Sequence, residues 1–302
     1  MSQPEILEGR TAYVNGDFLP IAEARVSVLD RGFLYGDGLY ETLNVANGRT
    51  FRLEAHLDRL FQSAAVLKIT VPLSRDALRD AIFATVERNA LADAYVRILL
   101  SRGESHPIID TRAAVRPATL VILVHSRQQP QEVASYFTGT GLNARIVSLR
   151  KIAPTALEPR VKSLNYLNSV LARAEAIEAG ADEAIMLDSD GFVAEGAGSN
   201  IFALHGATLV TPPVTSILVG VTRGVTIELA PAAGLAVVER NVTSYDLYTA
   251  SEVFLTSTYG GLTPIAKIDG RPIGHTCPGE VTSQLKAAYQ ALLESDGDAL
   301  PG

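Results

Sequence analysis

Lysine is scarce in this chain, and Lys162 is the lysine whose surroundings best suit chemistry. It stands in EPRVKSLNYLNSVLARAEA, between a short extended stretch and a predicted helix from about Leu164 to Ala179 with Ser163 as its N-cap. A lysine held at a buried junction loses its proton more easily than a surface lysine, as a Schiff-base nucleophile must. The alternative is a lysine whose stem packs beside the helix while its amine stays in water.

The segment Gly220-Val221-Thr222 is a candidate anion site. It directly precedes a helical run, so its backbone N–H groups and the helix dipole could hold a phosphate.

The strand-like run AYVRILL places a phenol and a guanidinium among apolar residues. Its period of two puts Tyr95, Arg97 and Leu99 on one face and the residues between them on the other. Arg97 therefore needs a partner, which is either a bound ligand or an internal acid such as Glu41. Tyr40, Thr42 and Asn44 share a face of an earlier strand, with Tyr35 just upstream.

The hydrophobic pattern that must position these residues predicts a mixed α/β (α+β) protein. TAYVNGDFLP and GLYETLNVANGRTFRL are expected to form hairpins that turn at Asn15-Gly16 and Asn47-Gly48. Two amphipathic helices follow, LEAHLDRLFQSAAVLKI and, behind a Ser74 N-cap, SRDALRDAIFATVERNAL. The β-branched runs AYVRILLS and ATLVILVHS complete a sheet.

We expect two domains: a small α/β domain over residues 1–125 and a larger, cofactor-binding domain over 143–302. Between them, RQQPQEVASYFTGTG breaks the periodicity and predicts a linker over 126–142. In the second domain, the helix after Lys162 is expected to turn a stripe of residues toward the core: Leu164, Leu167, Val170, Leu171 and Ala174.

Composition excludes several classes of function. The 302 residues carry a formal net charge of −7, which leaves no basic patch for nucleic acid or a membrane surface. Cys277 is the only cysteine, so an intrachain disulfide and a cysteine-rich metal site are excluded, and no metal is expected. With no signal-like start and no apolar run of about 18 residues, the sequence predicts a cytoplasmic protein.

Six segments, in order along nearly the whole chain, resemble the class IV aminotransferases. These are two-domain, fold-type IV enzymes that depend on pyridoxal 5′-phosphate (PLP) and share the D-amino acid aminotransferase-like fold. The segments are VSVLDRGFLYGDGLYET, FRLEAHLDRL, VKSLNYLNSVLARAEA, FVAEGAGSNIF, ILVGVTRG and FLTSTYGGLTPI.

The resemblance implies a role for each candidate residue. Lys162 would carry PLP and move the proton during catalysis, and Glu195 would keep the pyridine nitrogen protonated. Tyr166, expected one helical turn after Lys162, would bond the phenolic oxygen. The phosphate contacts would be Arg59, Val221, Thr222 and Thr258. The substrate contacts would be Tyr35, Tyr40, Tyr95, Arg97, Tyr259 and Gly260.

The subfamily signals are mixed. Branched-chain aminotransferases usually read aromatic-Glu-Gly-x-basic where this chain has Tyr40-Glu41-Thr42-Leu43-Asn44, and Thr42 is closer to the aminodeoxychorismate lyases. SRGESHPIID has His106 without the arginine that D-amino acid enzymes carry two residues before it, while Arg97 is usually absent from amine-selective members.

The weight of these features favours a ping-pong aminotransferase. Its donor would be an amino acid, hydrophobic or branched-chain, and its acceptor a 2-oxo acid such as 2-oxoglutarate. Transamination of D-amino acids or (R)-amines, and aminodeoxychorismate lysis, stay open. The family also implies a homodimer or a higher homo-oligomer.

Overall fold

The computed structural model describes residues 9–115, 117–127 and 141–300, which form two compact units. The first unit combines the described part of Met1–Gln129 with Val161–Asn165 and Leu293–Gly302, and the second takes the rest. The mixed α/β architecture predicted from the sequence is confirmed. Most of the predicted linker, residues 128–140, lies outside the described residues, so the predicted domain limits stay a prediction.

The first unit is built on a seven-stranded antiparallel sheet of order β16-β4-β3-β5-β6-β1-β2. Both predicted hairpins are confirmed, with Val14 opposite Asp17 and Ala46 opposite Arg49. Asn15 and Asn47 have φ values of 52° and 49°, the left-handed conformation that two-residue hairpin turns require. The strands are β1 (Thr11–Val14), β2 (Asp17–Pro20), β3 (Gly38–Ala46), β4 (Arg49–Thr50), β5 (Ala94–Ser101), β6 (Thr119–Ser126) and β16 (Asp298–Ala299).

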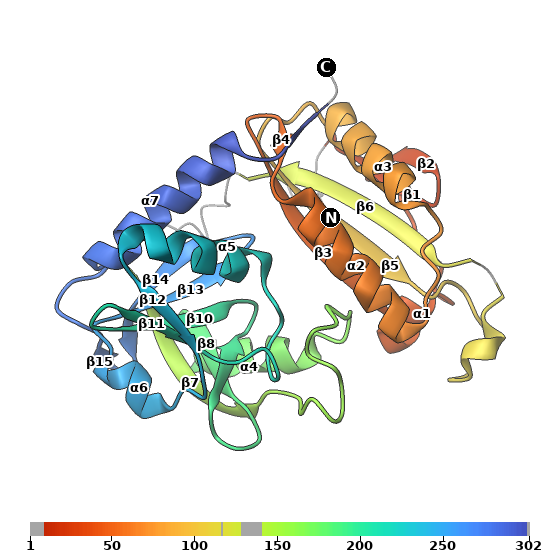
Figure 1. Cartoon of the computed structure of the whole chain (residues 1–302). Coiled ribbons are helices and arrows are strands. Elements are labelled where there is room, and N and C mark those ends of the chain that lie inside the picture. Colours follow the sequence, from red (N-terminus) through yellow and green to blue (C-terminus); the bar gives the residue numbers. More distant parts are fainter. Residues whose placement is uncertain (1–8, 116, 128–140, 301–302) are drawn as a thin grey trace. The chain divides into compact units, whose positions relative to one another are not determined.

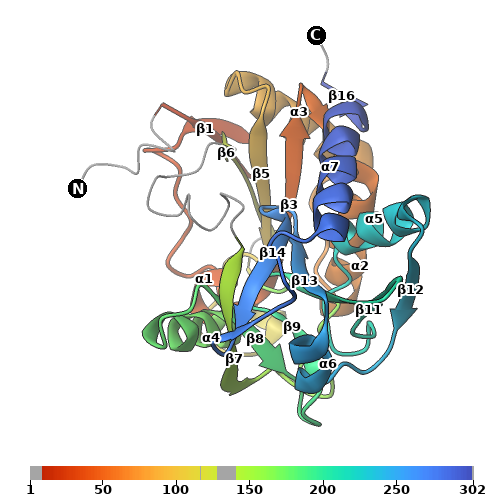
Figure 2. The ribbon, with the colours of Figure 1, turned by 90° about the vertical axis from the view of Figure 1, so that its left-hand side faces the viewer.

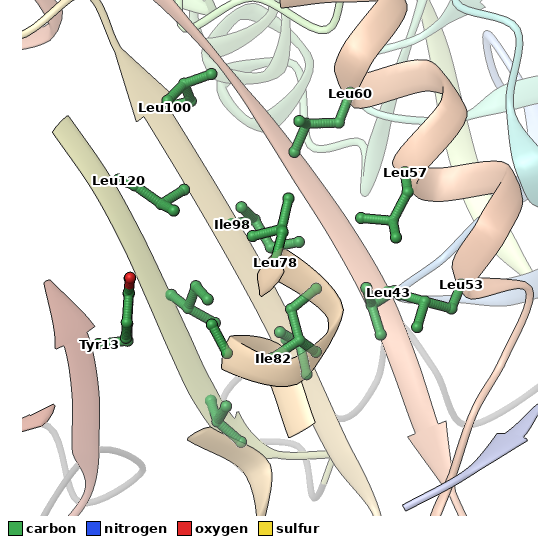
Figure 3. Packing of buried hydrophobic residues seen from close by; sticks show 14 of the residues in the cluster. Tyr13, Leu43, Leu53, Leu57, Leu60, Leu78, Ile82, Ile98, Leu100 and Leu120 are labelled. Atoms are coloured by element: carbon green, nitrogen blue, oxygen red, sulfur yellow. The ribbon is translucent and has the colours of Figure 1, made fainter. Parts of the chain in front are cut away.

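Two helices, α2 (Leu53–Leu67) and α3 (Arg75–Arg88), cover one face of this sheet (Figure 1). The side chain of Ser74 accepts a hydrogen bond from the backbone of Ala77, so the predicted N-cap is confirmed. Apolar side chains of both helices interdigitate with the inward residues of β3, β5 and β6 (Figure 3). A short helix, α1 (Arg31–Tyr35), precedes β3, and a 3-10 turn spans Thr111–Ala113.

The second unit is built on a nine-stranded mixed sheet of order β12-β11-β10-β13-β14-β7-β8-β9, with β15 paired to β14. Its strands are β7 (Leu142–Arg150), β8 (Glu183–Leu187), β9 (Val193–Gly196), β10 (Asn200–His205), β11 (Thr208–Thr211), β12 (Ala236–Glu239), β13 (Glu252–Ser257), β14 (Gly261–Ile268) and β15 (Arg271–Pro272). Its helical segments are α4 (Leu167–Glu178), α5 (Val221–Leu229), a 3-10 turn at Ala230–Ala233, α6 (Ser244–Thr249) and α7 (Glu280–Ser295). None of the described helices is both long and apolar enough to cross a membrane.

Helix α4 differs from its prediction at its start and in its orientation. It begins at Leu167, three residues later than expected, and Ser163 does not cap it. The helix packs on β7 and β8 (Figure 2). The residues that it buries there are small, among them Ala172 and Ala176. The expected core face is therefore wrong, since Leu167, Val170 and Leu171 are exposed. A close approach of helix to sheet favours small side chains, and the period alone does not say which apolar side is buried.

Candidate active site

Lys162 lies in a short segment that pairs with the edge of β3 in the first unit. The backbone N–H of Tyr40 donates to the carbonyl of Lys162 at 2.9 Å, and the N–H of Leu164 donates to that of Gly38 at 2.9 Å. A bridge between Leu39 and Ser163 completes the pairing. Residues 161–165 thus continue the sheet alongside the first half of β3, and this pairing fixes the backbone from which the Lys162 side chain leaves.

The ring of Tyr40 meets two cations. The amine of Lys162 lies 4.3 Å from the ring centroid, and the guanidinium carbon of Arg97 lies 5.1 Å from it. An aromatic face attracts each cation but holds neither by a directional bond. The structure therefore brings together the predicted cofactor lysine and two predicted substrate contacts.

The predicted alternation of β5 is confirmed, because Val96, Ile98 and Leu100 are fully buried in the helix-covered core. Thr42 lies opposite Arg97 in the sheet, so these two side chains share the other face. Glu41 points to the helix-covered face, and the alternative that it pairs with Arg97 is wrong.

Tyr95 stands farther along the face that carries Arg97. It is buried and lies opposite Asn44, and its ring stacks on that of His125 with centroids 5.4 Å apart and an interplanar angle of 17°. The stacking holds the Tyr95 ring upright on the sheet.

On the opposite face, Glu41 binds Arg59 through two hydrogen bonds. Nε of Arg59 donates to Oε1 at 2.6 Å, and Nη2 donates to Oε2 at 2.8 Å. Nδ1 of His56, one turn earlier on α2, lies 2.9 Å from Oε2. The glutamate and the histidine are fully buried and the arginine nearly so. Sequence reasoning missed this pairing, although an acid in an apolar strand is a signal for a buried cationic partner.

Burial shifts the pKa of both Glu41 and His56. It raises the pKa of Glu41, but the charge and hydrogen bonds of Arg59 outweigh this effect and bring that pKa down to about 2. Burial lowers the pKa of His56. Since an ionised carboxylate only accepts, the neutral imidazole donates through Nδ1.

Tyr35 closes α1 beside a buried arginine. The guanidinium carbon of Arg31 lies 5.1 Å from the centroid of the Tyr35 ring. Arg31 also binds Asp37 at 2.8 Å and donates to the carbonyls of Ile108 and Ile109 at 2.8 and 3.0 Å. Tyr35 itself stays partly exposed, and the fixed arginine provides one contact for its ring.

In the second unit, Glu195 is buried and held by three donors. Oε1 forms an ion pair with the amine of Lys151, while Oε2 accepts from Asn200 Nδ2 at 3.2 Å and from the backbone of Leu218 at 3.0 Å. Glu195 therefore lies in a buried strand, β9, and not in a solvated loop. Lys151 and Asn200 were missed, and the scarcity of lysine was the available signal for the first.

The predicted phosphate turn lies beside this carboxylate. Gly220 directly precedes α5, whose N-terminus has no side-chain cap, and Thr222 in its first turn is buried. A Cβ on Gly220 would lie 2.1 Å from the Asn200 side-chain oxygen, so a larger residue there would displace the Asn200 side chain. Uncapped N–H groups at a helix start suit an anion.

The loop between β13 and β14 carries Thr258, Tyr259 and Gly260. The N–H of Gly260 donates to the Ser257 hydroxyl at 2.9 Å, which closes the turn. Thr256, just before this loop, lies opposite Asn200 in the sheet and is buried. Its hydroxyl, like that of Ser199, has no hydrogen-bond partner among the described residues. Such buried hydroxyls are typical of a site that receives a polar ligand.

Tyr166 immediately precedes α4 as its N-cap residue and is partly buried. Because the helix begins after it, Tyr166 is not one helical turn beyond Lys162, and that geometric argument is wrong. Of the predicted residues, the first unit contains Tyr35, Tyr40, Arg59, Tyr95, Arg97 and Lys162, and the second contains Tyr166, Glu195, Val221, Thr222, Thr258, Tyr259 and Gly260.

Comparison with known proteins extends over nearly the whole chain. A family model described as amino-transferase class IV matches residues 38–268. A putative branched-chain-amino-acid aminotransferase of Methanocaldococcus jannaschii is 43% identical over 281 residues, covering 93% of this chain and 95% of the relative. A D-alanine aminotransferase of Bacillus licheniformis is 31% identical over 283 residues, covering 93% and 96%.

Solved structures agree with these relatives. A branched-chain aminotransferase of the thermophilic archaeon Thermoproteus uzoniensis, solved with norvaline, superposes with a TM-score of 0.86 at 31% identity, covering 95% of this chain and 96% of that one. The branched-chain amino acid aminotransferase of Escherichia coli gives a TM-score of 0.90 at 29% identity, covering 96% and 97%. A further branched-chain amino acid aminotransferase, solved with pyridoxamine 5′-phosphate, gives a TM-score of 0.88 at 31% identity and covers 95% of each chain. The predicted fold is confirmed.

Proposed function

The chain belongs to the class IV aminotransferases, and from this premise we propose that it transfers the amino group of a branched-chain or other hydrophobic amino acid to a 2-oxo acid such as 2-oxoglutarate. The reaction would be ping-pong and would use PLP bound at Lys162. The observation that carries the proposal is the placement of Lys162, whose amine lies over Tyr40 on the sheet face that also holds Arg97.

The donor set fits PLP. When bound, PLP acts as an electron sink that stabilises the carbanion left after a Cα proton is removed. Lys162 would hold it covalently and carry that proton as base and acid. The carboxylate of Glu195 would keep the ring nitrogen charged, and Tyr166 would donate to the phenolic oxygen. The phosphate would be bound by Arg59 and by the uncapped start of α5 at Val221 and Thr222, with Thr258 as a further contact.

The substrate side would be formed by aromatic and cationic side chains. Arg97 supplies a cation for a carboxylate, and Tyr40 and Tyr95 supply apolar surface on the same sheet face. Tyr35, Tyr259 and Gly260 would be further substrate contacts. A branched-chain donor is favoured over a D-amino acid because the relative named for branched-chain amino acids is 43% identical and the D-alanine enzyme 31%. Lyase chemistry has the support of Thr42 alone.

A half-reaction screen tests this proposal. The PLP-loaded protein is mixed with L-leucine, D-alanine, L-glutamate or an (R)-arylalkylamine, and the absorbance of the cofactor is followed. L-Leucine and L-glutamate should convert it to the pyridoxamine form. Conversion by D-alanine or the amine alone would contradict the branched-chain assignment, and pyruvate release without an acceptor would indicate a lyase.

A second test concerns the lysine. In Lys162→Ala, borohydride should trap no cofactor on the protein, whereas the exposed Lys267→Ala should trap as much as wild type. A retained adduct in Lys162→Ala, located by peptide mass, would refute the assignment of Lys162.

We further propose a homodimer, supported by the exposed apolar face of α4. Leu167, Val170 and Leu171 are 68%, 57% and 48% exposed, and a cluster of this kind suits a protein interface. Leu171→Glu should shift the mass in solution toward the monomer, measured by chromatography with light scattering. Val66→Glu on α2 is the control, since Val66 is similarly exposed but belongs to another helix. A cytoplasmic location stays a prediction from the sequence.

A further inference from the structure

The side chain of Arg59 is oriented by neighbouring protein groups. Its Nε and Nη2 donate hydrogen bonds to the two carboxylate oxygens of Glu41. Such a bidentate contact fixes the plane of a guanidinium as well as its position. Oε2 of Glu41 has a second partner in Nδ1 of His56, so the carboxylate is itself held in place. His56 therefore orients the carboxylate of Glu41, and Glu41 orients the guanidinium of Arg59.

The charges of this cluster balance. Glu41 is negative and Arg59 positive. Glu41 raises the pKa of His56, but burial, helped by the charges of Arg59 and Lys162, outweighs this and lowers it. A guanidinium taken out of water without a carboxylate would be strongly destabilising, so the pair is what permits a buried position for Arg59. It also leaves the arginine cationic, as an anion ligand requires.

Strand β3 connects the cluster of His56, Glu41 and Arg59 to Lys162. Alternation along β3 points Tyr40 to the face of Lys162 and the next residue, Glu41, to the face of α2. The backbone of Tyr40 is bonded to that of Lys162. The dipeptide Tyr40-Glu41 therefore holds the lysine and the arginine at a fixed separation within the first unit.

We propose that Glu41, supported by His56, is the positioning residue that sets Arg59 for the phosphate of the cofactor. The inference rests on the proposed function, in which Arg59 is the phosphate contact. It predicts a change that depends on the phosphate group: loss of Glu41 weakens the binding of PLP but not of pyridoxal, the same aldehyde without phosphate.

The test measures the affinity of the full chain for PLP and for pyridoxal, by titration of the absorbance and of the borohydride-trapped adduct. Glu41→Asp keeps the negative charge but is too short to reach both nitrogens of Arg59. It should weaken PLP binding by roughly 10- to 100-fold, the range known for groups that orient metal-binding side chains, and leave pyridoxal binding within about twofold. Glu54→Asp, at the exposed start of α2, should change neither affinity.

Two variants of His56 keep the inference falsifiable if Glu41→Asp is unstable. His56→Asn retains a donor near Nδ1 and should bind PLP as wild type does, whereas His56→Leu should lose PLP affinity selectively. In the Arg59→Met background, Glu41→Asp should cause no additional loss, because the two residues act as one unit.

The outcomes separate the two proposals. If wild type binds neither compound, the proposed function fails, and the positioning role fails with it. If wild type prefers PLP and Glu41→Asp keeps that preference, or loses both affinities equally, the positioning role alone is refuted.

Discussion

Gly220→Ala should lower the stability of the second unit and disturb the proposed phosphate contact at the start of α5. Gly220 has φ −70° and ψ 135°, a conformation open to alanine, so backbone strain plays no part. The added Cβ would lie 2.1 Å from Asn200 Oδ1, which must retreat by about 1.3 Å to reach ordinary contact at 3.4 Å. That movement breaks the Asn200 Nδ2 bonds to Glu195 and to the carbonyl of Leu218. One acceptor is charged and one is neutral, so we expect the free energy of unfolding to fall by about 2 to 4 kcal/mol.

The measurement is equilibrium unfolding of the apo protein in urea, followed by circular dichroism. Gly224→Ala is a matched control, since it introduces the same Cβ one turn later in α5, where no atom lies within 4 Å. It should stabilise the protein by about 0.5 to 1 kcal/mol through helix propensity. A Gly220→Ala protein as stable as wild type, with unchanged PLP affinity, would refute the reasoning that Asn200 holds Glu195 against the turn.

Charged residues provide three more predictions. The pKa of Glu41 is lowered from 4.5 to about 2, so the ionised carboxylate adds about 3 kcal/mol to the free energy of unfolding above pH 4.5, and this is lost as the pH falls to 2. Acid unfolding of Glu41→Gln should lack this pH-dependent loss of stability. Identical pH profiles for the variant and wild type would contradict the lowered pKa of Glu41. Lys151→Met removes the cation beside Glu195 and should lower the free energy of unfolding by about 3 kcal/mol in urea titrations, whereas Lys267→Met on the surface should leave it unchanged. Glu252 accepts two backbone N–H groups at the start of α7, so Glu252→Ala should cost about 1 to 2 kcal/mol in thermal denaturation, and an unaltered midpoint would show that the cap is dispensable.

Local structure followed from the sequence because its causes are local. The pair Asn15-Gly16 specifies a two-residue turn wherever it stands, and Ser74 caps the helix that follows it. The alternation of β5 needed only its own apolar residues, so the face that carries Arg97 was predicted correctly.

The errors concern contacts between distant segments. Periodicity showed that α4 has apolar residues on several sides, and only packing on β7 and β8 selected Ala172 and Ala176 for burial over Leu171. The partner of Glu41 depended on two long-range contacts: the register that places Arg97 opposite Thr42 on the other face, and the packing of α2 on β3 that brings Arg59 to Glu41. No local signal shows that residues 161–165 join a sheet whose other strands lie far away in sequence.

The pairing of residues 161–165 with β3 forms late during synthesis on the ribosome. Residues 38–40 of β3 appear early, but the segment that covers their free side appears more than a hundred residues later, after β7 has been made. Until then the nascent chain exposes a strand edge able to pair with another nascent chain. Lys162, the residue proposed to carry the cofactor, belongs to the segment that ends this exposure, so its synthesis and the covering of this edge of β3 occur together.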